Sequence, residues 1–197
     1  MDPGRSSNPF SSRHVTPAAV PYIFPEGRTL GDFLAPLEEN GWTGELAGPE
    51  GAGKTTLLFT IAAELRRRGL RSMLFRIREE RPRLPLAWRL AVRRAAVVLV
   101  DSAELLRPSA VESLIASCQR RKSGLLLTTH VPFGLGLSCR VEPHPECFHA
   151  LVARLLAPEG KTLGREQARA LLLRHGGNAR EALFDLYEQW ERGALDQ

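Results

Sequence analysis

Residues 48–55 read Gly-Pro-Glu-Gly-Ala-Gly-Lys-Thr, which fits the Gly-x-x-x-x-Gly-Lys-(Ser/Thr) pattern of a phosphate-binding loop. A short strand is predicted just before it, from Trp42 to Ala47, and apolar residues recur at helical spacing from Lys54 to Arg68. Glycines let backbone N–H groups converge on phosphate oxygens, and the start of a helix adds the positive end of its dipole. This strand–loop–helix unit predicts an α/β fold with a phosphate site beside the sheet.

The loop pattern assigns chemistry to individual side chains. Lys54 is expected to reach the β- and γ-phosphates of ATP, and the Thr55 hydroxyl is expected to ligate Mg²⁺. Lys122 and Lys161 are the only other lysines among 27 Lys and Arg residues, so lysine at 54 indicates a need for a compact ammonium. The predicted nucleotide-binding residues are Gly48, Pro49, Glu50, Gly51, Ala52, Gly53, Lys54, Thr55 and Thr56.

A second signal is the apolar run from Val97 to Val100, which ends at Asp101. Such a run is typical of a strand buried on both faces of a parallel sheet. Ligands of open α/β sheets bind at the carboxyl ends of the strands, where Asp101 would lie. We therefore expect Asp101 to hold the Mg²⁺ shell together with Thr55.

A third buried strand is predicted from Leu125 to Thr129. Thr128, Thr129 and His130 stand at its end, where a polar side chain can orient a water molecule near the γ-phosphate. A hydroxyl that only caps the strand end is the alternative. The next predicted strand, over 137–141, follows after a connection that is short for a parallel crossover, so we expect it to be displaced or absent.

The chain divides into three predicted parts. Residues 1–27 are rich in proline and serine and are expected to form a flexible tail. Strand and helix patterns alternate over residues 28–142, which predicts a nucleotide-binding core with a parallel sheet covered by helices. The strand signal stops after Pro143, and residues 143–197 are expected to form a small helical lid.

A further pattern lies at the start of the last predicted helix, in the part of the chain that we expect to form the lid. Residues 177–183 read Gly-Asn-Ala-Arg-Glu-Ala-Leu and resemble the Gly-x-x-Arg-x-Ala-Leu start of a lid helix in clamp-loader and origin-binding AAA+ proteins. With the phosphate loop and the strand ending at Asp101, residues 40–192 resemble a minimal AAA+ ATPase with a small lid. The resemblance implies that Arg180 reaches the γ-phosphate from the lid, and that Thr129 senses it from the sheet.

The chain departs from the AAA+ pattern beside Asp101. The family usually has glutamate at the next position to polarise water, but this chain has Ser102. Glu104 is the nearest carboxylate and either takes that role, directly or through a second water, or is a surface residue at a helix start. Glu79 and Glu80 follow the second predicted strand and are expected to lie at the sheet edge, away from the nucleotide.

Other features exclude classes of protein. The longest apolar run, Ala95 to Val100, is too short to cross a membrane, and the N-terminus lacks the apolar stretch of a secretory signal. Three cysteines do not suggest a disulfide framework, and a cytoplasmic protein is expected. The arginines between residues 66 and 94 could contact nucleic-acid phosphates or an acidic protein, but a solvated face is the interpretation that the sequence favours.

Together these patterns predict an ATPase that hydrolyses ATP with Mg²⁺ to drive or switch an interaction with a macromolecular partner. The partner is a protein or a nucleic acid, and the sequence leaves open whether the chain forms a homo-oligomer. The alternatives are a small-molecule kinase and a nucleotide-dependent binding module with little hydrolysis, which Ser102 favours. The predicted catalytic residues are Lys54, Asp101, Glu104, Thr129 and Arg180.

Overall fold

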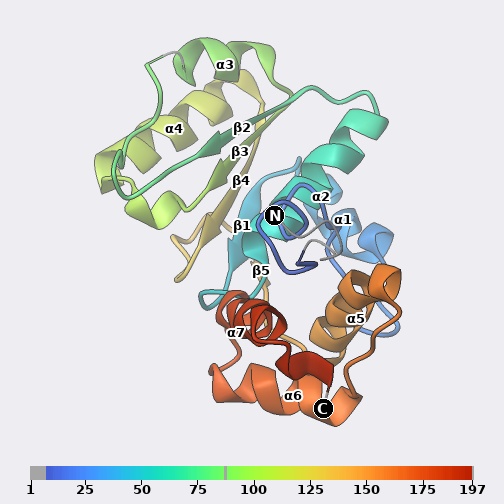
Figure 1. The fold of residues 1–197 in the computed structure, drawn as a ribbon. Coiled ribbons are helices and arrows are strands. Elements are labelled where there is room, and N and C mark those ends of the chain that lie inside the picture. Colours follow the sequence, from blue (N-terminus) through green and yellow to red (C-terminus); the bar gives the residue numbers. More distant parts are fainter. Residues whose placement is uncertain (1–7, 87, 197) are drawn as a thin grey trace.

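The computed structural model describes residues 8–86 and 88–196 and contains a five-stranded parallel sheet in the order β2-β3-β4-β1-β5 (Figure 1). The predicted α/β fold with a parallel sheet and C-terminal helices is confirmed. The strands are β1 (Gly44–Ala47), β2 (Ser72–Arg76), β3 (Val97–Asp101), β4 (Gly124–Thr129) and β5 (Ser138–Arg140).

Helices cover both faces of the sheet (Figure 1). Because successive side chains of a strand point to opposite faces, Val97 and Leu99 of β3 pack in one apolar cluster while Val98 and Val100 pack in another. The first cluster lies under α1 and α2, and the second lies under α3 and α4. These helices are α1 (Leu30–Glu39), α2 (Lys54–Arg67), α3 (Trp88–Arg94) and α4 (Pro108–Arg121).

The expectation that the last strand is displaced or absent is wrong. β5 pairs in parallel with β1, with Glu45 opposite Ser138. Glu45 is fully buried, and its carboxylate accepts hydrogen bonds from the backbone N–H groups of Phe133, at 2.6 Å, and Leu135. The segment between β4 and β5 therefore crosses β1 without a helix. It can do so because a nearly extended chain rises about 3.3 Å per residue and the strands that it has to pass are short.

The C-terminal helices pack around a third apolar cluster. They are α5 (Pro145–Leu156), α6 (Arg165–Arg174) and α7 (Ala179–Glu191), which we call the lid helices; short 3₁₀ turns lie at Ala103–Leu105, Ala157–Glu159 and Ala194–Asp196. In Figure 1 the lid helices lie beside the sheet at the β5 end.

Residues 8–27 differ from the flexible tail expected of residues 1–27, because they pack against both the lid helices and α2. Asn8 Nδ2 donates to the backbone oxygen of Tyr187 at 3.0 Å, and the buried Phe10 ring meets Trp190 edge-on. Farther along, the Tyr22 N–H donates to Thr60 Oγ1 of α2 at 2.9 Å. Residues 1–7 lie outside the described part of the chain.

Candidate nucleotide-binding site

Lys54 is the first residue of α2 and directly follows the glycine-rich loop. Gly53, just before it, has a φ of 90°, a left-handed conformation that favours glycine. The Lys54 side chain is 9% exposed, and Nζ donates to the backbone oxygens of Gly48 at 2.6 Å and Pro49 at 2.7 Å. Burial lowers the pKa of the Lys54 ammonium, and the carboxylates of Glu104 and Asp101 act in the opposite direction. The loop thus holds a partly desolvated cation where the pattern predicts phosphate.

The glycines of the loop allow close approach by neighbouring backbone. A Cβ at Gly48 would lie 2.1 Å from the oxygen of Val141, and a Cβ at Gly51 would lie 2.0 Å from Asn178 Oδ1. Gly51 also has a φ of 73°. Since Asn178 caps the start of α7, this contact joins the tip of the phosphate loop to the lid helices.

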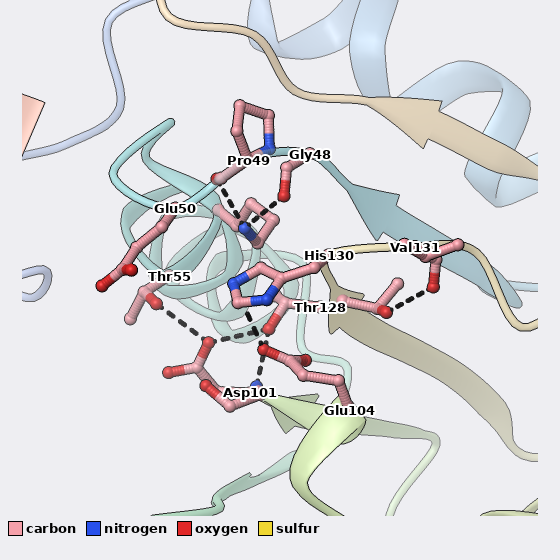
Figure 2. Close-up of polar contacts among 12 residues, drawn as sticks. Gly48, Pro49, Glu50, Thr55, Asp101, Glu104, Thr128, His130 and Val131 are labelled. Atoms are coloured by element: carbon pink, nitrogen blue, oxygen red, sulfur yellow. Dashed lines mark hydrogen bonds and ion pairs between the residues drawn. The ribbon is translucent and has the colours of Figure 1, made fainter. Parts of the chain in front are cut away.

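Thr55 and Asp101, the predicted Mg²⁺ ligands, lie in direct contact. Thr55 Oγ1 donates to Asp101 Oδ1 at 2.9 Å, and Asp101 is 2% exposed (Figure 2). A hydroxyl and a carboxylate that converge beside a phosphate loop are the oxygen ligands that Mg²⁺ uses, commonly through bound water. The residues therefore fit the ion that the sequence predicts.

Thr128, rather than Thr129, contacts this pair. Thr128 Oγ1 donates to Asp101 Oδ1 at 2.9 Å and accepts the Ser102 N–H at 2.7 Å. Thr129 points to the other face of β4, where its hydroxyl donates to the Val131 backbone oxygen at 2.6 Å. The structure therefore does not bring Thr129 to the Asp101 carboxylate, and its hydroxyl caps the strand end.

Glu104 is brought into the site by an unusual turn. Ser102 has φ 60° and ψ 52°, a left-handed conformation that is uncommon outside glycine, and the chain turns back after β3. Glu104 Oε1 lies 3.5 Å from His130 Nε2 (Figure 2), and Oε2 is buried with no hydrogen-bond partner among the described residues. A buried carboxylate oxygen without a partner indicates a place for a ligand or a water molecule.

Arg180 reaches from the lid helices to the loop. Its Nη1 lies 3.1 Å from Glu50 Oε1, and both side chains are more than half exposed. Its backbone N–H donates to Asn178 Oδ1 at the start of α7. An exposed pair of this kind is worth little free energy, so the guanidinium can exchange Glu50 for a phosphate at small cost.

Most of the predicted site residues therefore line one cavity of about 960 Å³; Gly48, Pro49 and Thr129 are not part of its lining. Its walls come from the phosphate loop, the ends of β3 and β4, the first turns of α7 and the N-terminal segment. Neither the protein-family models nor the curated proteins contain a match to this sequence.

Solved structures do match. The AMPPCP-bound replication initiator DnaA of Aquifex aeolicus aligns with a TM-score of 0.62 at 16% identity, over 88% of this chain and 64% of that one. DnaA bound to AMPPCP and single-stranded DNA gives 0.62 at 16% identity, over 85% and 62%. RuvB of Thermotoga maritima gives 0.54 at 17% identity, over 73% and 53%. The chain has an AAA+ fold.

The likeness of this AAA+ fold to the solved structures has limits. The chain spans less than two thirds of the DnaA chains that it matches. At 16% identity this match establishes the fold alone. Within residues 8–86 and 88–196, none of the helices is both long enough and apolar enough to cross a membrane.

Two contributions to the site of this AAA+ fold were not predicted. Arg76 Nε lies 3.2 Å from Asp101 Oδ2, because the two residues are opposite each other in the β2–β3 register. Glu79 and Glu80 follow β2, which lies at the edge of the sheet as expected, and they line the same cavity as Lys54. The strand order could have suggested the contact between Arg76 and Asp101, since the parallel neighbours β2 and β3 end at the same edge of the sheet.

Proposed function

We propose that this AAA+ chain binds ATP with Mg²⁺ and hydrolyses it to switch an interaction with a macromolecular partner. The observation that carries the proposal is the convergence of the loop cation Lys54, the Thr55–Asp101 pair and the partnerless Glu104 Oε2 in one cavity. The solved DnaA structures bound to the ATP analogue AMPPCP support the choice of nucleotide.

Each side chain has a separate part in the proposed reaction. Lys54 exchanges its bonds with loop carbonyls for bonds with phosphate oxygens, which places its charge against the transferred group. Thr55 and Asp101 would hold Mg²⁺, which neutralises phosphate charge when bound. Glu104 orients the attacking water and accepts its proton, because its free carboxylate oxygen is the unpaired base of the cavity.

The cavity also has room for the base of the nucleotide. Tyr22 and Ile23 of the N-terminal segment and Leu183 of α7 also line it. These apolar side chains suit a purine ring, while the phosphates lie over the loop. Because α7 also carries Arg180, nucleotide binding would draw the lid helices and the loop together.

Nucleotide titration tests the binding half of the proposal. Lys54→Ala should abolish binding of a fluorescent ATP analogue, because the loop loses its cation. Lys122→Ala is the matched control, since it removes an exposed lysine at the end of α4. Equal affinities of the two variants would contradict the assignment of the loop.

A binding module with little hydrolysis is the second candidate, and Ser102 in place of the usual glutamate favours it. ADP release by the wild type and by Glu104→Gln separates the two candidates. Equally negligible rates would establish the binding module. A rate in the wild type that the variant loses would establish the ATPase.

A kinase reaction is a further candidate because Glu79 and Glu80 line the cavity that holds Lys54. Carboxylates at that end of the cavity could bind the hydroxyl of an acceptor. ADP release that requires an added acceptor instead of water would support this candidate.

The macromolecular partner that we propose is a protein. The alternatives are a nucleic acid, which one of the solved DnaA structures binds, and a second copy of the chain.

A further inference from the structure

The edge of the sheet at β2 presents backbone groups that no other described residue pairs with. Among the described strands, β2 pairs only with β3, whose Val97 N–H donates to the Arg71 backbone oxygen. At the other end of β2 the Ile77 N–H donates to the oxygen of Asp101. Since the direction of the backbone groups alternates along a strand, Ser72, Leu74 and Arg76 direct their N–H and C=O groups away from the sheet.

A groove of about 730 Å³ lies along the first half of this edge. Its walls are α2, the start of β2 and residues 17–21 of the N-terminal segment. Apolar surface dominates the walls, to which Ala62 and Ala63 of α2 contribute, as does Met73 of β2, which is 38% exposed. The groove therefore offers room for alternate side chains of an added strand.

Three arginines from different elements surround the groove. Arg66 lies on α2, Arg71 precedes β2 and Arg94 ends α3. All three are exposed, and in the described part of the chain none has a carboxylate within ion-pairing distance. By contrast, the adjacent Arg67 and Arg68 pair with Glu64. The charge at the groove is thus uncompensated within the described residues.

These observations select one kind of occupant. Two copies of this edge would bring like charges together, so pairing of β2 with itself is disfavoured. A nucleic-acid strand would need open aromatic faces for base stacking, and the one ring that lines the groove, Phe59, has the Arg76 guanidinium 5.4 Å from its centroid. An acidic strand supplies both backbone partners and compensating charge.

We propose that the open edge of β2 binds an extended acidic segment of a partner protein by strand addition. Backbone groups of the segment pair with Ser72, Leu74 and Arg76. Its carboxylates pair with the arginines, and its alternate apolar side chains enter the groove. The surface uses no residue of the phosphate loop, so the proposal stands independently of nucleotide hydrolysis.

Amide hydrogen exchange followed by NMR on the full chain tests the pairing. The probe is a synthetic peptide that alternates glutamate and valine. Its addition should protect the amides of Ser72, Leu74 and Arg76 at least about ten-fold. The amides of Met73 and Phe75 are an internal control, because they already face β3. Binding without new protection at the three open amides would overturn strand addition.

Fluorescence anisotropy with the labelled peptide tests the role of the arginines. Replacing Arg66, Arg71 and Arg94 together by Gln should weaken binding about ten-fold, since each exposed ion pair contributes about two-fold. The matched control replaces Arg120, Arg121 and Arg165 by Gln, which removes the same charge elsewhere, and should bind as the wild type does. Equal losses in both variants would reduce the effect to net charge and overturn the proposal.

Two further probes separate the remaining possibilities. A peptide methylated on alternate backbone nitrogens keeps its charge but cannot pair, and it should bind at least about five-fold more weakly. Equal binding of the methylated peptide would overturn the proposal. So would tighter binding of an oligothymidylate that displaces the acidic peptide, because the surface would then be a nucleic-acid site.

Discussion

Exchanging the two neighbouring threonines of β4 for valine distinguishes the observed site from the one expected by analogy with the AAA+ family. Thr128→Val removes the hydroxyl that donates to Asp101 Oδ1 at 2.9 Å and accepts the Ser102 N–H at 2.7 Å. Valine has the same shape, so packing in β4 is preserved and only the hydrogen bonds are lost.

The structure gives the size of this effect. A hydrogen bond to a charged group contributes about 1.5–3 kcal/mol, and the orphaned Ser102 N–H adds a cost of about 1–3 kcal/mol. We expect Thr128→Val to lower the free energy of unfolding by about 3 kcal/mol, and the melting temperature by about 6–12 °C for a domain of this size. Affinity for Mg²⁺-nucleotide should fall at least about ten-fold, because Asp101 loses one of its fixed partners.

Thr129→Val is the control for this comparison. It loses a single bond to the Val131 backbone oxygen, worth about 1 kcal/mol, and should leave nucleotide affinity unchanged. Thermal melts and titration with a fluorescent ATP analogue measure both quantities. If Thr129→Val weakened nucleotide binding more than Thr128→Val, the placement of the two side chains would be refuted.

Three other predictions follow from single contacts. Arg76→Gln removes the guanidinium from Asp101 Oδ2. Because that positive charge repels a cation held by the same carboxylate, the Mg²⁺ concentration needed for nucleotide binding should fall by roughly three- to ten-fold, and an unchanged midpoint would contradict this. Glu45→Gln leaves the backbone N–H of either Phe133 or Leu135 without an acceptor, so the melting temperature should fall by about 3–12 °C. Calorimetry that finds no change would be evidence that Glu45 does not hold the connection between β4 and β5. Burial raises the pKa of the Cys118 thiol to about 11, so the thiol of the unfolded chain loses its proton at lower pH than that of the folded chain. The free energy of unfolding should therefore decline by on the order of 2 kcal/mol as pH rises from about 9 to 11. A Cys118→Ala variant with the same decline over this range would show that other groups cause it.

Much of the fold was predictable because its signals are local. The glycine pattern of residues 48–55 and the apolar run before Asp101 each specify a strand, its end and the chemistry placed there. Parallel strands end at one edge of a sheet, so the contact between Thr55 and Asp101 followed from two separate motifs.

The features that sequence reasoning missed depend on register, backbone conformation or tertiary packing. The choice between Thr128 and Thr129 depends on which of the two side chains points to the α2 face of the sheet, and a shift by one residue reverses it. For Glu104 the sequence left open whether the carboxylate lies in the site or on the surface, and it enters the site because Ser102 adopts a left-handed conformation that the sequence alone does not specify. β5 forms because the buried Glu45 tethers a connection that has no helix.

The N-terminal segment shows the same limit. Its proline and serine content suggested a flexible tail, yet Phe10 is buried against the lid helices. A single apolar residue in a polar stretch gives no periodic signal. Only the tertiary structure shows which surface it covers.

Single-turnover hydrolysis of ATP by Glu104→Gln tests the central claim most directly. The variant retains a side chain of the same shape and should bind Mg²⁺-ATP as tightly as the wild type. It lacks the carboxylate that orients and deprotonates water, so its hydrolysis rate should fall about 10²- to 10⁴-fold. A wild type that hydrolyses ATP no faster than Glu104→Gln would contradict the account.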